Sequence, residues 1–504
     1  MLTLPPDGVQ TWTIDGYAWK DGRWMNSRKK RDHMHSPLNI YEVHLGSWKR
    51  HGDEPQGKTP RAERRHSTRS RTTVPVRSAV EFYSYDDLSE GTCRLRQNHG
   101  IHPHRGYARA RAPLRWFMGL SAHRLLRSDL AIWHSPAVHA FVESCHKAGI
   151  GVILDWVPGG FCADAQGLST FNGKMLYERE IHPNWGTHKF DFGRPEVVSF
   201  LISNALFWVE CFHADGIRMD GVSSMLYLNF GVDNPADKKF NKYGTEEDLD
   251  ASAFIRKVNT VIGETHPDVM MIAEESTAWP LVTYPPADGG LGFHFKWDMG
   301  WMNDTLHYMQ TDFPWRPGNH RMLTFSIMYS FNENFVLPLS HDEVVNGKCS
   351  LIGRMPGDQW RKFAGLRTLA LYQMTHPGAK LNFMGNELGE YLEWRDEKEL
   401  GWNLLTYPIH DSLHEYVKAL HKLYLEQPAL YKSDYNSTSF RWIDADNKNQ
   451  CIYAYRRSDP SGKTLYMVFN FSGSYQNYSL RSSKTEPTKS FSTLTVIFIV
   501  DQTA

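Results

Sequence analysis

The sequence predicts an α/β protein in which a (β/α)₈ TIM barrel is followed by a C-terminal antiparallel β-sandwich domain. From about residue 38 to 430, short apolar segments that read as buried strands alternate with amphipathic helical segments, which is typical of a parallel sheet with helical crossovers. Acidic residues recur where these strands end, and such a barrel places its functional groups at the carboxyl ends of its strands. After about residue 431 the helical patterns stop and short alternating strands follow.

Local signals place the individual elements of the barrel. Ser135 and Pro136 suit the N-cap and first position of a helix, and Gly149 is a typical helix stop. The expected strands are 40–44, 151–156, 215–220, 269–273, 335–342 and 380–385. The expected helices are 135–148, 194–212, 247–264, 358–375 and 411–426.

Three regions are expected along the chain. Residues 1–37 read as the remnant of a β module or a linker, 38–430 as the barrel, and 431–504 as a small β domain. The expected strands of that domain are 439–443, 451–455 and 464–471. After about residue 480 the sequence becomes rich in Ser, Thr and Lys, which leaves open whether the last domain is complete.

Bulk composition narrows the class of protein. Lys plus Arg and Asp plus Glu both number 56 among 504 residues, which argues against a nucleic-acid or membrane-surface protein that acts by bulk charge. The six cysteines are scattered without a CxxC motif, so we expect reduced thiols and a cytoplasmic protein. The N-terminus lacks the pattern of a signal peptide, and the apolar run 494–500 is too short to cross a bilayer.

The strand that ends at Asp220 carries the first chemical signal. Arg218 and Asp220 are two residues apart, so on a strand their side chains share one face. A neighbouring guanidinium favours the ionised form of a carboxyl group, which predicts that Asp220 is a charged and oriented oxygen nucleophile. Taken alone, such a pair is more often an ordinary ion pair at the end of a strand.

Four expected strands end on acids, namely Asp155, Asp220, Glu274 and the pair His341–Asp342. No Cys/His cluster has metal-ligand spacing and no Gly-rich phosphate loop precedes a helix, so we expect neither a metal nor a cofactor. Carboxylates that converge at a barrel mouth suit glycoside chemistry, in which one attacks the anomeric carbon and a second exchanges a proton with the leaving oxygen. The alternative is a set of unrelated buried or capping acids.

Several long runs carry a resemblance to a known family. The runs are Ile40-Tyr-Glu-Val-His-Leu-Gly-Ser-Trp48, Ala148-Gly-Ile-Gly-Val-Ile-Leu-Asp-Trp-Val-Pro-Gly159, Ala273-Glu-Glu-Ser-Thr-Ala-Trp-Pro280, Gly290-Leu-Gly-Phe-His-Phe-Lys-Trp-Asp-Met-Gly-Trp301 and Leu337-Pro-Leu-Ser-His-Asp-Glu-Val-Val345. With these runs the chain resembles the bacterial 1,4-α-glucan (glycogen) branching enzymes of the α-amylase superfamily, glycoside hydrolase family 13. The resemblance covers roughly residues 1–50 and 138–475.

The resemblance implies three catalytic residues. Asp220 would be the nucleophile that forms a covalent glucosyl intermediate, Glu274 the general acid/base, and Asp342 the group that stabilises the oxocarbenium-like state. Glu275 competes with Glu274, but strand alternation lets only one of the two face the mouth, and the family motif selects Glu274.

The resemblance also implies binding residues and a reaction. Arg218 would orient Asp220, while Asp155 and His341 would contact the sugar in the cleavage subsite. The implied reaction is retaining: an α-1,4 bond of an α-glucan such as glycogen or amylose is cleaved, and the chain is transferred to a 6-hydroxyl in glycogen biosynthesis. We expect a monomer that binds neither nucleic acid nor membrane.

The chain departs from the family pattern in three places. Gly160 stands where the family has a histidine, so a sugar contact is lost. Only the last strand or linker of the N-terminal carbohydrate-binding β-sandwich is expected to remain. Residues 91–137 lack the family's second barrel strand and its Gly-Ser-Trp-Gly-Tyr turn. A barrel without that strand would leave two neighbouring edges unpaired unless another segment fills the gap.

Residues 51–137 are atypical, and one hypothesis is that 91–137 are translated out of frame. Because Trp and Met each have a single codon, Trp116-Phe117-Met118-Gly119 read one base later must give Gly, then Leu or Ser, then Trp, as in the missing turn. The alternative is a divergent insert. Resequencing of the gene tests this, and an uninterrupted reading frame with no insertion or deletion against close relatives would refute the frameshift.

Two further functions compete with a branching enzyme. One is an α-1,4-glucan hydrolase, in which water replaces the sugar acceptor. The other is an inactive descendant that at most binds glucan; Gly160 and 91–137 favour it, whereas the intact set of Asp220, Glu274 and Asp342 opposes it.

Overall fold

The computed structural model describes most of the 504-residue chain. The described residues are 16–49, 114–118, 135–161, 169–170, 172–479 and 496–499. For 114–118, 135–137 and 496–499 it describes the backbone only.

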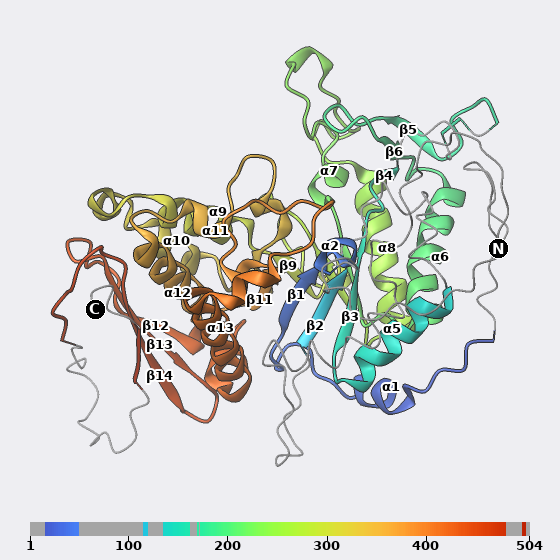
Figure 1. The fold of residues 1–504 in the computed structure, drawn as a ribbon. Coiled ribbons are helices and arrows are strands. Elements are labelled where there is room, and N and C mark those ends of the chain that lie inside the picture. Colours follow the sequence, from blue (N-terminus) through green and yellow to red (C-terminus); the bar gives the residue numbers. More distant parts are fainter. Residues whose placement is uncertain are drawn as a thin grey trace, which may run out of the picture.

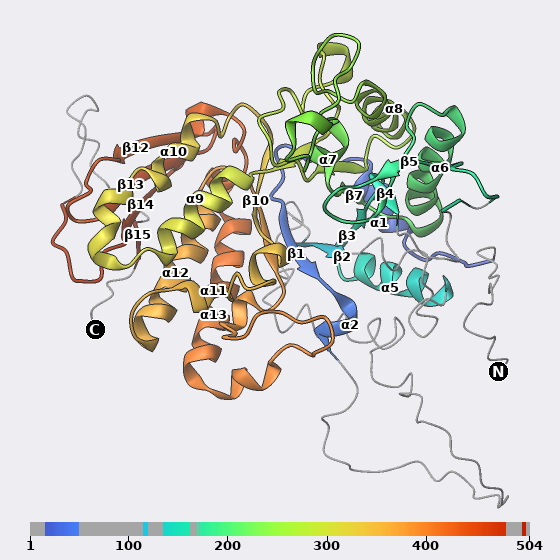
Figure 2. The same ribbon diagram turned by 90° about the horizontal axis from the view of Figure 1, so that it is seen from above.

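Eight parallel strands close into a barrel (Figures 1 and 2). Around the ring their order is β1-β11-β10-β9-β8-β7-β3-β2, so every strand lies beside its neighbours in chain order, as in a (β/α)₈ barrel. The strands are β1 (Asn39–Val43), β2 (Leu114–Met118), β3 (Gly151–Trp156), β7 (Gly216–Met219), β8 (Met270–Ala273), β9 (Phe295–Trp297), β10 (Phe335–Leu339) and β11 (Ala379–Phe383). The predicted fold class is therefore confirmed for the barrel.

Helices cover the outside of the barrel, and side chains fill its inside. Ile40, Ile153, Ile272, Val336 and Leu381 come from five different strands and pack in one buried cluster, as expected for a filled barrel interior. The helices of the described part are α1 (Gly22–Arg28), α2 (Leu45–Trp48), α5 (Ser135–Lys147), α6 (Pro195–Phe212), α7 (Val222–Leu226), α8 (Leu249–Thr265), α9 (Met299–Gln310), α10 (Met322–Phe325), α11 (Leu351–Arg354), α12 (Gln359–Thr375) and α13 (Pro408–Glu426).

Local sequence explains where the long helices begin. The Asp248 side chain accepts hydrogen bonds from two backbone N–H groups at the start of α8, and the Asp358 side chain accepts one, from Arg361, at the start of α12. Among the described helices, only α6 has the length and apolar composition that a membrane span requires. Its buried residues pack with Phe254 and Ile255 of α8, so it has the packing of a core helix.

Strand β2 corrects one expectation. We expected the barrel to lack its second strand, but Leu114–Met118 pairs in parallel with β1 on one side and β3 on the other. Only five residues, apolar except for one arginine, lie between Pro113 and Gly119. A run this short shows no periodicity from which a strand could be predicted. Pairing there leaves no open edge on β1 or β3. The rest of 91–134 lies outside the described residues, so the frameshift hypothesis stays untested.

The N-terminal segment is helical where it is described. The structure has α1 in this segment, while residues 1–15, where a remaining strand of the β module would lie, are outside the described part. The Trp24 indole donates a hydrogen bond to Asp215 at 2.8 Å, and Arg28 pairs with Asp268 at 2.6 Å. Since Asp215 directly precedes β7, these contacts attach α1 to the end of the barrel where the strands begin (Figure 1).

A lobe projects beyond the opposite end, where the strands finish (Figure 1). It contains a small antiparallel sheet of β4 (Gly160–Phe161), β6 (His188–Phe190) and β5 (Glu178–Ile181), inserted between β3 and α6. The long connection 227–248 between α7 and α8 lies beside it, and the Lys239 ammonium pairs with Glu180 of β5.

The C-terminal domain is a four-stranded sheet in the described residues. Its order is β12 (Phe440–Asp444), β13 (Ile452–Ser458), β14 (Thr464–Asn470) and β15 (Val496–Ile499). The first three strands are antiparallel as expected, whereas β15 runs parallel to β14. A parallel neighbour requires a long connection, and the residues between the two strands supply that length.

Candidate active site

The six predicted site residues lie at the carboxyl ends of four barrel strands. Two of them lie one residue before the end of a strand, and the other four lie in the first few residues after a strand. They are Asp155 on β3, Arg218 on β7, Asp220 after β7, Glu274 after β8, and His341 with Asp342 in a 3-10 turn after β10. We expected a strand over 335–342, but β10 ends at Leu339, so His341 and Asp342 are held by a turn.

Arg218 is the centre of the site. Its Nη1 lies 2.6 Å from Asp155 Oδ1 and 2.5 Å from Asp220 Oδ1, and the guanidinium stacks 4.3 Å from the centre of the Trp297 ring. Burial by itself lowers the pKa of Arg218, but Asp155, Asp220 and Glu274 raise it above its usual range. Arg218 is therefore a permanent cation that fixes one oxygen of Asp220, whose side chain remains 35% exposed at the mouth.

Glu274 has the opposite electrostatic character. Its Oε2 accepts the backbone N–H of Gly221 at 2.7 Å. Burial raises the pKa of Glu274 to about 7, and the charges of Asp220 and Asp342 act in the same direction, against Arg218 and the Gly221 N–H. A carboxyl group with this pKa carries a proton for much of the time near neutrality, as a general acid requires.

Glu275 points into the barrel wall. It is fully buried, accepts hydrogen bonds from Ser223 Oγ at 2.9 Å and Thr277 N at 2.8 Å, and pairs with Lys296 Nζ at 2.5 Å. Both oxygens of the Glu275 carboxylate are therefore engaged by neighbouring residues of the barrel wall. Of the two neighbouring glutamates, Glu274 is thus the one near Asp220 and Asp342.

His341 is held by a carboxylate that sequence reasoning did not identify. Glu42 of β1 accepts the His341 backbone N–H at 3.1 Å and pairs with its Nδ1 at 2.5 Å. Burial opposes the charged ring, but Glu42 outweighs it and raises the pKa of His341 to about 10. The resulting imidazolium places Nε2 3.4 Å from Asp342 Oδ1. The feature of the sequence that could have identified Glu42 is its position as an acid within the apolar run Ile40–Val43.

Asp155 completes the charge balance. Burial raises its pKa to about 7, where the attraction of Arg218 is opposed by the repulsion of Asp220. Three carboxyl groups around one guanidinium cannot all ionise easily. Of the two acids bound to Arg218, Asp220 is the more exposed to water, so its free oxygen is the more accessible from the mouth.

Gly160 fits its place in the lobe closely. It pairs with Lys189 across β4 and β6, and a Cβ at this position would lie 2.3 Å from the carbonyl oxygen of His188. A histidine therefore cannot occupy position 160 without a backbone shift, so the departure from the family pattern is matched by the local structure.

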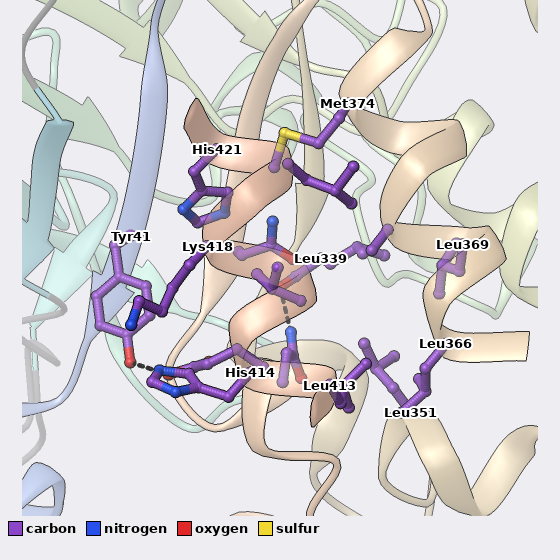
Figure 3. Close-up of a pocket in the computed structure, with 16 residues that line it drawn as sticks. Tyr41, Leu339, Leu351, Leu366, Leu369, Met374, Leu413, His414, Lys418 and His421 are labelled. Carbon is purple, nitrogen blue, oxygen red and sulfur yellow. Dashed lines mark hydrogen bonds between the residues drawn. The ribbon is translucent and has the colours of Figure 1, made fainter. Parts of the chain in front are cut away.

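A separate cavity lies outside the barrel wall (Figure 3). It has a volume of about 40 Å³ and lies between β10, β11, α12 and α13. Tyr41, which donates a hydrogen bond to Glu387 at 2.6 Å, lines it, whereas its neighbour Glu42 faces the mouth. None of the six site residues lines this cavity. In the described part of the chain, Asp411, His414 and Glu415 of α13 are the group close enough to share a metal ion, and two of the three are exposed.

Comparisons with known proteins agree with this geometry. Residues 442–489 match the model of the alpha-amylase C-terminal all-beta domain. A solved structure, a putative alpha amylase from Salmonella typhimurium, superposes with a TM-score of 0.64 at 15% identity and covers 95% of this chain and 83% of that one; at this identity the likeness concerns the fold.

Closer relatives are named 1,4-alpha-glucan branching enzyme GlgB. The protein from Desulfitobacterium hafniense is 44% identical over 469 residues, which cover 93% of this chain and 70% of the relative. The protein from Oceanobacillus iheyensis is 44% identical over 91% of this chain and 69% of its own length, and the one from Aquifex aeolicus is 41% identical over 92% and 70%. The chain therefore belongs to the 1,4-α-glucan branching enzyme family.

Proposed function

We propose that this chain is a branching enzyme that cleaves an α-1,4 bond of a glucan and transfers the released chain to a 6-hydroxyl. The observation that carries the proposal is the pair of unlike carboxyl groups at the barrel mouth. Arg218 Nη1 lies 2.5 Å from Asp220 Oδ1, while burial raises the pKa of the neighbouring Glu274 to about 7. Membership of the family supports this reading, and cytoplasmic glycogen synthesis is the corresponding setting.

The first half-reaction uses both carboxyl groups at once. Asp220 Oδ attacks the anomeric carbon while Glu274 gives its proton to the glycosidic oxygen. The C1–O4 bond breaks, the reducing-end fragment leaves as an alcohol, and a covalent β-glucosyl ester forms on Asp220. Arg218 keeps the attacking oxygen oriented, so the entropy cost of orienting the nucleophile in the transition state is small.

The second half-reaction reverses the roles. Glu274, now ionised, removes the proton of an acceptor 6-hydroxyl, and that oxygen attacks C1 as the ester bond to Asp220 breaks. Two inversions restore the α configuration. Asp342 and the His341 imidazolium flank the reacting sugar, where Asp342 stabilises positive charge at the ring and the His341 Nε2–H can donate to a sugar hydroxyl. Asp155 is placed to contact the same sugar.

Amylose provides the direct test. The iodine colour is followed, and reducing ends are counted before and after treatment with a debranching enzyme. We expect colour to fall and additional ends to appear only after debranching. Ends that appear before debranching would indicate a hydrolase instead. No change with a folded protein, as Gly160 suggests for an inactive descendant, would refute the proposal.

A variant pair ties the activity to the site. Asp220→Asn removes the nucleophilic charge, and we expect a loss of at least about a thousandfold in turnover. Asp411→Asn, an exposed carboxyl on α13 outside the mouth, is the matched control and should keep wild-type turnover. Comparable activity in Asp220→Asn would show that another group attacks the sugar.

A further inference from the structure

Trp185 is a large aromatic side chain at the mouth that the reaction scheme leaves unused. It lies in the turn between β5 and β6 and is 54% exposed. Its ring comes within 3.7 Å of the position that a Cβ would take on Gly221. Gly221 directly follows Asp220 and donates its backbone N–H to Glu274. The indole is thus one residue away from the reacting groups.

The indole is fixed in its orientation. One of its faces stacks on the His182 ring, with centroids 3.9 Å apart and planes 6° apart. His182 Nδ1 accepts the backbone N–H groups of Asn184 at 3.2 Å and Trp185 at 3.3 Å. Burial lowers the pKa of His182 to about 4, so the supporting ring is neutral. A pre-organised flat surface binds without an additional ordering cost.

The lobe around Trp185 carries further exposed apolar side chains. Phe240 and Tyr243, from the connection between α7 and α8, are 59% and 70% exposed. That connection is joined to the turn at its base, since Phe230 packs against both His182 and Trp185. Exposed aromatic faces on the mouth side of a barrel suit a substrate with alternating apolar and polar surfaces, such as a glucose ring.

We propose that Trp185 is the stacking platform for the acceptor glucan, and that it decides between transfer and hydrolysis. This inference rests on the proposed branching activity. The acceptor hydroxyl must give its proton to Glu274, and the edge of the indole lies beside Gly221, whose N–H holds Glu274. A sugar ring stacked on Trp185 would therefore approach the glucosyl–Asp220 ester from the side of Glu274. Water needs no platform, so loss of the indole weakens transfer selectively.

The test compares three substitutions at Trp185 with one elsewhere. Trp185→Ala removes the platform, Trp185→Leu keeps apolar bulk without a flat face, and Trp185→Phe keeps a smaller aromatic face. Trp315→Ala is the matched control, because Trp315 is 72% exposed and belongs to the 3-10 turn Phe313–Asn319 between α9 and α10. These two helices lie away from β5 and β6 in both views (Figures 1 and 2). For each protein, new α-1,6 linkages and new reducing ends are counted on amylose, with Tm as a check of folding.

We expect Trp185→Ala and Trp185→Leu to lower the ratio of transfer to hydrolysis by about tenfold. Trp185→Phe should recover most of it, and Trp315→Ala should match the wild type. A wild-type ratio in both Trp185→Leu and Trp185→Ala would overturn the platform while leaving the branching activity intact. Absence of α-1,6 linkages from the wild-type chain would instead overturn the branching activity and the platform together.

Discussion

At the scale of single residues, the site depends on how one cation is shared. Arg218 binds Asp155 and Asp220 through the same nitrogen, so Glu274 receives its attraction only at longer range and is hydrogen bonded to Gly221 instead. Two neighbouring carboxyl groups thereby obtain different surroundings, and burial raises the pKa of Glu274 to about 7. The unlike pair is what a double displacement requires.

The pH dependence follows from Glu274. Cleavage requires its protonated form, and its pKa is raised to about 7, so the protonated fraction falls as pH rises through 7. We expect kcat/KM for amylose to be maximal on the acid side of neutrality and to decline tenfold per pH unit well above 7. The pKa of Asp155 is also raised to about 7. The decline of kcat/KM above pH 7 therefore reports the joint titration of Glu274 and Asp155.

Initial rates measured between pH 5 and 9 check this. An α-glucosyl fluoride is the control substrate, since fluoride leaves without needing a proton from Glu274. A cleavage rate on amylose that stays constant from pH 7 to 9 would contradict the assignment of Glu274 as the acid.

At the scale of the secondary-structure elements, the β4–β6 pairing determines what position 160 can hold. The carbonyl oxygen of His188 lies 2.3 Å from where a Cβ would be, and the atom belongs to the backbone of a paired strand. We expect Gly160→Ala to lower the free energy of unfolding by about 2 kcal/mol, the usual range for overpacking. Gly160→His should be no better.

Gly263 provides the matched glycine. It lies within α8, and a Cβ there meets no atom within 4 Å, so Gly263→Ala should be neutral or more stable by about 0.5 kcal/mol. Thermal unfolding of both variants, compared with the wild type, measures the difference. If Gly160→Ala were as stable as Gly263→Ala, β4 and β6 would not be packed as described.

At the scale of the whole molecule, the sequence predicts the barrel well because its buried strands are apolar and its helices amphipathic. The missed elements are those with weak local signals. Phe295–Trp297 of β9 is only three residues long, and Leu114–Met118 of β2 lies in an arginine-rich stretch. Both segments are strands because closure of the barrel pairs each of them with a neighbouring strand on either side. A short window of the sequence carries no information about this pairing.

The same reasoning separates the predictable part of the site from the rest. Asp220 and Glu274 each end an apolar strand, so position alone marks them. Glu42 and Trp297 act through partners remote in sequence: Glu42 binds His341, which lies 299 positions away, and Trp297 lies under Arg218. Trp185 is in a turn without periodicity. Only the assembled barrel brings these side chains to one mouth.

The most direct measurement of the central claim is to trap the covalent intermediate. Glu274→Gln should still form the ester from an α-glucosyl fluoride, because fluoride needs no acid, but should release it slowly for lack of a base. Peptide mass spectrometry of the reacted protein is then predicted to find one glucosyl unit on the peptide that contains Asp220. A glucosyl unit on a different carboxylate, or turnover with inversion and no adduct, would contradict the account.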